Sequence, residues 1–121
     1  MPITYHEDPA TRTAELSVNG RITRSDFDTL APKFEAFAET YGPIRLIEIV
    51  ESLGGFDPSL IWKGLKLDFR VIPRISHCAV VGDAPWLSPL TRASGAVLPV
   101  KLRAFPMAEL AAARAWIAAA D

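Results

Sequence analysis

The chain has few of the residues that staple a small fold or attract it to a charged partner. It holds one cysteine, Cys78, and two histidines, which excludes an internal disulfide and disfavours a cysteine-built zinc site. Thirteen basic and fourteen acidic side chains leave a formal net charge of −1, so nothing draws the whole chain to nucleic acid or to an anionic membrane.

Long apolar runs are also missing. No uninterrupted stretch approaches the roughly twenty residues of a membrane span, and the first twelve residues carry acids where a signal peptide needs a basic region. We therefore expect a soluble, cytoplasmic protein with no nucleic-acid partner, no stable membrane insertion, and no metal or other cofactor.

The sequence does contain enough apolar residues for a full core. It has 121 residues, of which 50% are hydrophobic, with a mean hydropathy of +0.18. A chain of this size buries about two thirds of its unfolded surface. This predicts one domain spanning residues 1–121.

The first half of the chain alternates strand and helix patterns. Period-two alternation over 2–7 and 13–19 flanks a turn and predicts a β-hairpin whose second strand ends at Gly20. Apolar residues at helical spacing then predict a helix from about residue 23 to 41, capped by Thr23 or Ser25 and kinked or shortened at Pro32. Residues 44–50 predict a central strand, and residues 51–55 its exit loop.

The second half continues the alternation. We expect a helix over 58–72, a central strand over 75–82, and a short helix that begins at Asp83 and ends near Gly95. Residues 97–105 predict a strand, which Pro99 places at a sheet edge or a strand start. A last helix begins at Pro106.

The order β-β-α-β-α-β-α-β-α predicts an α/β domain with a mostly parallel sheet of about five strands and an N-terminal hairpin. Right-handed crossovers between neighbouring strands place the helices mainly on one face. The opposite face would then expose apolar side chains of the central strands, which predicts a homodimer through that face. The dimer-face candidates are Ile47, Ile49, Cys78 and Val80, or else the alternate rows of the same two strands.

Loops at the carboxyl ends of the parallel strands form the expected functional edge, where helix N-termini offer free amides to a partner or an anionic ligand. The candidates along this edge are Arg21, Arg24, Gly54, Gly55, Phe56, Trp62, Asp83 and Trp86.

No catalytic or metal site follows from the pattern. His6 lies beside Glu7 and Asp8 but has no second histidine nearby, whereas a site needs three or four converging ligands. His77 and Cys78 are adjacent on a strand, so their side chains point to opposite faces and cannot form a nucleophile and base pair. We therefore expect a protein that is not an enzyme.

Four stretches carry a resemblance to a known family. They are NGRITRSDFDTLAPKFE, IRLIEIVE with the following GGF, ISHCAVVGDAPW, and LRAFPMAELAAARAWI. The chain resembles the SpoIIAA-like family, whose members share the STAS fold of anti-sigma-factor antagonists and are also described as similar to the lipid-transfer CRAL-TRIO domain.

The resemblance directs attention to serines. In true antagonists a serine at a helix start, inside an Asp-Ser-Ser-Gly type motif, is phosphorylated and breaks the complex. That motif is absent here. Ser59 is the nearer positional match and Ser52 the second, although Ser59 beside Pro58 also suits an ordinary helix cap.

Two functions remain open. The first is a non-enzymatic STAS-like interaction or regulatory module, a homodimer with a protein partner that resembles an anti-sigma factor. The alternative is a binder of a small apolar or anionic ligand, or a lipid, between the second helix and the sheet near Leu60, Ile61 and Trp62. An enclosed apolar cavity of at least about 300 Å³ would favour the ligand binder.

Overall fold

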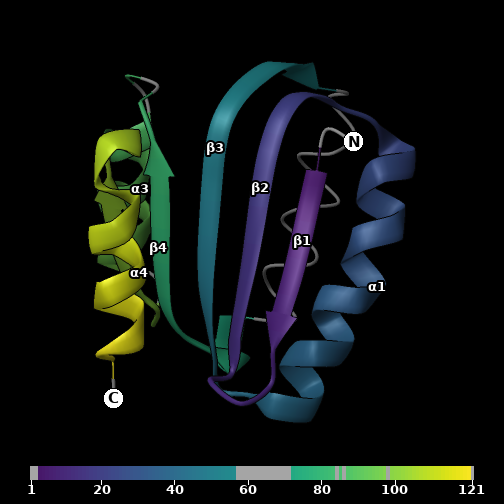
Figure 1. The fold of residues 1–121 in the computed structure, drawn as a ribbon, viewed down its shortest axis with the longest axis vertical. Helices are drawn as coiled ribbons and strands as arrows, with labels where there is room; N and C mark the ends of the chain where they lie inside the picture. Colours follow the sequence, from purple (N-terminus) through teal and green to yellow (C-terminus); the bar gives the residue numbers. More distant parts are fainter. Residues whose placement is uncertain (1–2, 57–71, 84, 86, 98, 121) are drawn as a thin grey trace.

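A five-stranded sheet in the order β1-β2-β3-β4-β5 organises the molecule (Figure 1). The structure is a computed structural model that describes residues 3–56, 72–83, 85, 87–97 and 99–120. The helix predicted over 58–72 lies outside these residues except for Ile72. The elements are β1 (Ile3–Asp8), β2 (Thr13–Ile22), α1 (Arg24–Tyr41), β3 (Ile44–Phe56), η1 (Ile72–Arg74), β4 (Ile75–Gly82), α3 (Leu87–Val97), β5 (Lys101–Phe105), η2 (Met107–Glu109) and α4 (Leu110–Ala118).

The predicted hairpin and mostly parallel sheet are confirmed. β1 pairs antiparallel with β2, and the ladders β2–β3, β3–β4 and β4–β5 are all parallel. Strand β4 has the predicted bounds, and β5 lies at the sheet edge as Pro99 suggested. Its first residue is Lys101, four residues later than expected.

Helix α1 begins at a full capping box. The Thr23 hydroxyl accepts the Asp26 N–H at 3.2 Å, and the Asp26 carboxylate accepts the Thr23 N–H at 2.9 Å, which satisfies two donors that the first turn leaves free. The helix continues through Pro32 as one element, so the expected shortening there is wrong. It ends at Gly42, whose N–H donates to the Ala38 carbonyl at 2.9 Å.

Strands β2 and β3 are longer than predicted. Gly20, with φ of +99°, does not end β2, and residues 51–55 are not a loop but the last part of β3. The two segments pair with each other, Asn19 with Ser52 and Ile22 with Phe56, across two register shifts. Neither segment shows by its own sequence that it continues as a strand, because each extension needs the other as its hydrogen-bonding partner.

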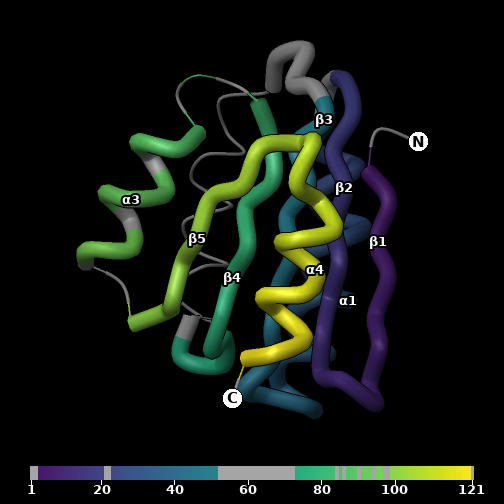
Figure 2. The backbone as a smooth tube through the Cα atoms, turned by 60° about the vertical axis from the view of Figure 1, so that its left-hand side comes forward, coloured from purple at the N-terminus to yellow at the C-terminus, as the bar shows by residue number. Residues whose placement is uncertain are grey.

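The sheet is covered on both faces. One core cluster joins α1 and α3 to the sheet through residues such as Phe37, Leu46 and Leu87. A second joins α4 to the other face through Ile47, Val81 and Ile117, among others. Figure 2 shows α4 in front of the strands and α1 behind them.

The position of α4 corrects the expectation that one face stays open. Right-handed crossovers fix the side of a helix that joins two parallel strands, as α1 and α3 do. Helix α4 follows the last strand and joins nothing, so the rule does not constrain it. Its buried residues are Ala113 and Ile117, with Met107 and Leu110 packed against the same cluster.

Candidate functional site

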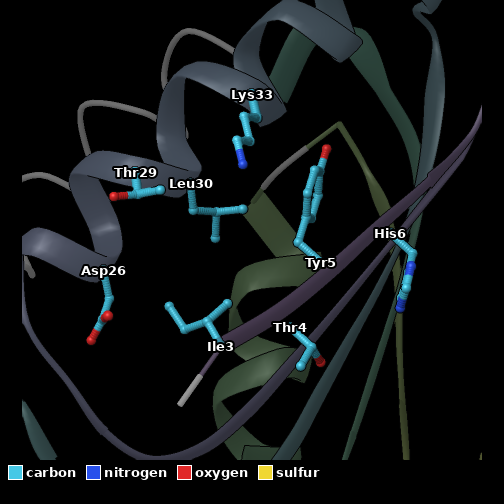
Figure 3. A pocket seen from close by; sticks show the side chains of 8 residues that line it. All are labelled: Ile3, Thr4, Tyr5, His6, Asp26, Thr29, Leu30 and Lys33. Atoms are coloured by element: carbon cyan, nitrogen blue, oxygen red, sulfur yellow. The ribbon is translucent and has the colours of Figure 1, made fainter. Parts of the chain in front are cut away.

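A groove lies between the edge strand β1 and helix α1 (Figure 3). Its volume is about 380 Å³. Ile3 and Tyr5 of β1 point toward Leu30 and Lys33 of α1 across it, whereas His6 points away. The other lining residues are Thr4, Asp26 and Thr29. The apolar part comes from strand and helix together, because the alternating side chains of β1 meet the residues of α1 spaced three apart.

The groove continues along the sheet edge. A second hollow of about 650 Å³ shares Tyr5, His6 and Lys33 with the first and extends along α1 as far as Tyr41. The tilted ring pair Phe37 and Tyr41, with centroids 5.2 Å apart, forms its end. We call the two hollows together the β1–α1 groove. It runs beside most of β1.

The polar groups of the groove come from Tyr5, Asp26 and Lys33. The Tyr5 hydroxyl donates to Glu7 Oε2 at 2.7 Å, and burial, reinforced by that carboxylate, raises the pKa of Tyr5 well above its ordinary value. Hydrogen bonds from Thr23 lower the pKa of Asp26. Lys33 is exposed, and among the described residues it has no ion pair. A groove with a neutral phenol, a carboxylate and a free ammonium can bind a polar chain or ligand.

The predicted functional edge is only partly within the described residues. Gly54 and Gly55 lie in β3, Arg24 is the first residue of α1, and Asp83 Oδ1 accepts the Met107 N–H at 3.0 Å, which ties the end of β4 to η2. Asp83 therefore has a structural partner. Backbone positions, but no side chains, are described for Arg21, Ser52 and Phe56, all in strands; Ser59, Trp62 and Trp86 lie outside the described residues.

The proposed dimer face is wrong. Ile47, Ile49, Cys78 and Val80 are 3%, 4%, 5% and 7% exposed within the single chain. They do not share a face either: Ile47 and Ile49 pack under α4, whereas Cys78 and Val80 pack on the α1 side. The register explains this, because Ile47 pairs with Ala79 and Leu46 with Cys78.

Neither histidine belongs to a converging set of metal ligands within the described residues. His77 is buried, its Nδ1 is 3.0 Å from Ser76 Oγ, and its ring meets Trp116 edge-on with centroids 5.6 Å apart. Cys78 belongs to the opposite core cluster, so the two neighbours do point to opposite faces. Within the described part of the chain, no three His, Cys, Asp or Glu side chains are placed to hold a metal ion.

The sequence reasoning missed the β1–α1 groove. The signal present was the alternation of Ile3 and Tyr5, together with Leu30 and Lys33 at helical spacing. Nothing local shows that α1 stands off the edge strand far enough to leave a hollow, because that distance depends on the packing of Phe34 and Phe37 against the sheet.

The comparisons with known proteins agree with this architecture. The model of the SpoIIAA-like family matches residues 13–118. The chain belongs to the SpoIIAA-like family. Its fold is also similar to the crystal structure of an uncharacterized protein from the DUF3478 family with a SpoIIAA-like fold from Shewanella loihica PV-4, with a TM-score of 0.79 and 18% identity over 95% of this chain and 93% of that one.

No curated protein matches this SpoIIAA-like chain. At 18% identity the Shewanella structure supports the fold alone. None of the described helices is both long and apolar enough to span a membrane.

Proposed function

We propose that this SpoIIAA-like chain is a non-enzymatic interaction module that binds an extended segment of a partner protein in the β1–α1 groove. The observation that carries the proposal is the position of the groove beside an edge strand. An edge strand offers unpaired N–H and C=O groups, and an added strand takes up these groups while neighbouring pockets select its side chains.

The composition of the groove suits such a segment. Ile3 and Leu30 offer an apolar patch, Lys33 an ammonium group, and Glu7 a carboxylate farther along the strand. β1 has six residues, and an extended peptide beside it would place every second side chain on the face of the groove. A partner is therefore recognised by its backbone first and by its side chains second.

The small-ligand alternative has one supporting observation. The first hollow of about 380 Å³ has the size of a small-molecule site. It opens into the second hollow, which shares three of its residues and runs on along α1. A site that continues along a strand favours an elongated occupant, so the peptide is the primary proposal.

Site-specific photo-crosslinking in cells tests the proposal. A photoreactive residue at Thr29, which lines the groove, is expected to give discrete protein adducts. The same residue at the exposed Ala111 of α4, across the sheet, serves as the matched control. A second change, Leu30→Arg, fills the groove and should abolish the Thr29 adducts.

Three outcomes would count against a protein partner in the β1–α1 groove. Equal adducts from Thr29 and Ala111 would indicate random contact, and adducts that survive Leu30→Arg in a folded variant would place the partner elsewhere. The third outcome comes from native mass spectrometry of the purified chain. A small molecule that is retained by the native protein and lost in Leu30→Arg would establish the ligand-binding alternative.

A further inference from the structure

The β5 edge of the sheet, opposite the β1–α1 groove, differs in charge from the side that carries the groove. Residues 84–108 carry three basic side chains and no acidic one, although the whole chain has net charge −1. Residues 1–41, at the other side of the sheet, carry seven acidic and four basic side chains. Figure 2 shows β1 and β5 at the two ends of the strand order, with α3 beside β5.

Two of the three cations belong to strand β5, and the third lies beside it on α3. Lys101 and Arg103 pair in register with His77 and Ala79, so their side chains lie on the face that α4 covers. Arg92 comes from α3 on the other face and lines, with Lys101 and Pro99, a hollow of about 550 Å³ between α3 and β5. All three are exposed, and within the described residues none has an acidic partner.

Aromatic rings hold one of these cations in place. The Arg103 guanidinium lies 4.8 Å from the centroid of the Phe105 ring, a distance typical of a cation–π contact. Phe105 in turn packs against Trp116 of α4, with centroids 6.0 Å apart. Because Arg103 is positioned before any partner arrives, less side-chain entropy is lost when it binds.

We propose that the β5 edge is a second binding surface and takes an acidic, extended segment of a partner protein as a sixth strand. Lys101 and Arg103 are two residues apart, so their side chains stand on one face about 6.6 Å from each other. A segment with Glu or Asp at alternate positions places one carboxylate opposite each cation, and opposite charges in directly paired positions stabilise a sheet.

The same charges select against other occupants. Exposed cations on an edge strand discourage pairing with a second β5, because Arg103 would meet like charge there. Nucleic acid is disfavoured because three cations neutralise few phosphates, whereas affinity for nucleic acid grows with the number of phosphates neutralised. An acidic protein segment satisfies both the edge and the charge.

The test uses two labelled hexapeptides, Thr-Glu-Val-Glu-Val-Thr and Thr-Lys-Val-Lys-Val-Thr, with the full chain. We expect the acidic peptide to bind roughly tenfold more tightly, since two attractive pairs replace two repulsive ones. Added salt should reduce the difference because these charges are exposed. Hydrogen-exchange protection should appear at the amides of β5.

Charge reversal provides the decisive comparison. The double variant Lys101→Glu with Arg103→Glu should reverse the preference, whereas Arg12→Glu, at an exposed cation in the β1–β2 turn outside both surfaces, should leave it unchanged. The side chains replaced in both variants are exposed, and circular dichroism checks that each variant folds. The photo-crosslinking at Thr29 is independent of this preference, so either proposal can fail alone.

Several results would overturn the proposal. These are equal binding of the two peptides, no measurable binding of either, protection at β1 rather than β5, or a preference unmoved by charge reversal. Tighter binding of an oligo-dT strand than of the acidic peptide would assign the surface to nucleic acid. Concentration-dependent sedimentation abolished by the double variant would assign it to a second copy of the chain.

Discussion

Replacing Ile117 by Ala tests whether α4 closes the second face of the sheet. Ile117 is 2% exposed and packs in the cluster with Ile47, Ile49 and Val81. The change removes three buried carbon atoms, which is worth about 2.4 kcal/mol at 0.8 kcal/mol for each. The cavity left behind adds to this, so we expect a loss of about 3 kcal/mol, within the range of 2–5 measured for such changes.

Urea unfolding followed by circular dichroism measures this loss. A chain of this size has an m-value of roughly 2 kcal/mol per molar urea, so a loss of about 3 kcal/mol lowers the midpoint by about 1.5 M. An unchanged m-value would show that the native state keeps its compactness. If the substitution instead loosens α4 and exposes Ile47 and Ile49, the m-value should fall and the native protein should bind a hydrophobic dye.

The matched control lies on the same helix. Arg114 forms an ion pair with Glu15 of β2, but its side chain is 53% exposed. Exposed pairs contribute about 0.2–1 kcal/mol, so Arg114→Ala should lower the midpoint only slightly. If Ile117→Ala costs no more than Arg114→Ala, α4 does not pack on the sheet as described.

Two further predictions concern a close approach and a cap. Gly82→Ala should destabilise the protein by about 1–3 kcal/mol, because its Cβ would lie 2.6 Å from Leu87 Cδ2 and 3.0 Å from the Val50 carbonyl oxygen, a backbone atom. Gly95→Ala, whose Cβ has room in α3, should stabilise the protein slightly. Equal effects of the two substitutions in urea unfolding would contradict this prediction. Hydrogen bonds from Thr23 lower the pKa of Asp26. The charged carboxylate therefore stabilises the folded chain when the pH is above its ordinary pKa of 3.8. This contribution is lost as the pH falls through the lowered pKa of the folded state. The stability difference between the native chain and Asp26→Asn should be constant at neutral pH and shrink as the pH falls below about 4; a difference that does not shrink there would contradict the assignment.

Local patterns predicted the parts of the fold that local chemistry determines. The Thr23 cap, the end of α1 at Gly42 and the bounds of β4 each follow from residues within a few positions. The strand order agrees with the assumption that successive parallel strands lie side by side. Family resemblance and local pattern pointed to the same architecture.

The errors arose where a feature depends on distant residues. Gly54 and Gly55 suggest a loop, yet they continue β3 because β2 continues beside them. The grouping of Ile47 with Cys78 failed because a shift between Ile44 and Arg45 changes which residues of β3 and β4 lie opposite each other. The groove could not be foreseen at all, since it depends on how far α1 stands from the sheet edge.

The covered faces determine where partners can bind. With α1 and α3 on one face and α4 on the other, the backbone groups that the described part of the sheet leaves for pairing are those at its two edges. These edges differ in charge, which raises the question of whether one copy's β1 would pair with another copy's β5. On its α4 side β1 presents Thr4, His6 and Asp8, a single carboxylate, whereas an acidic partner strand presents two. With one ion pair fewer, self-pairing is weaker than pairing with the acidic segment by about 0.2–1 kcal/mol. Head-to-tail pairing of this kind would also build a ring or an open chain rather than a two-fold dimer. The cations of β5 therefore favour an acidic partner over the chain's own edge.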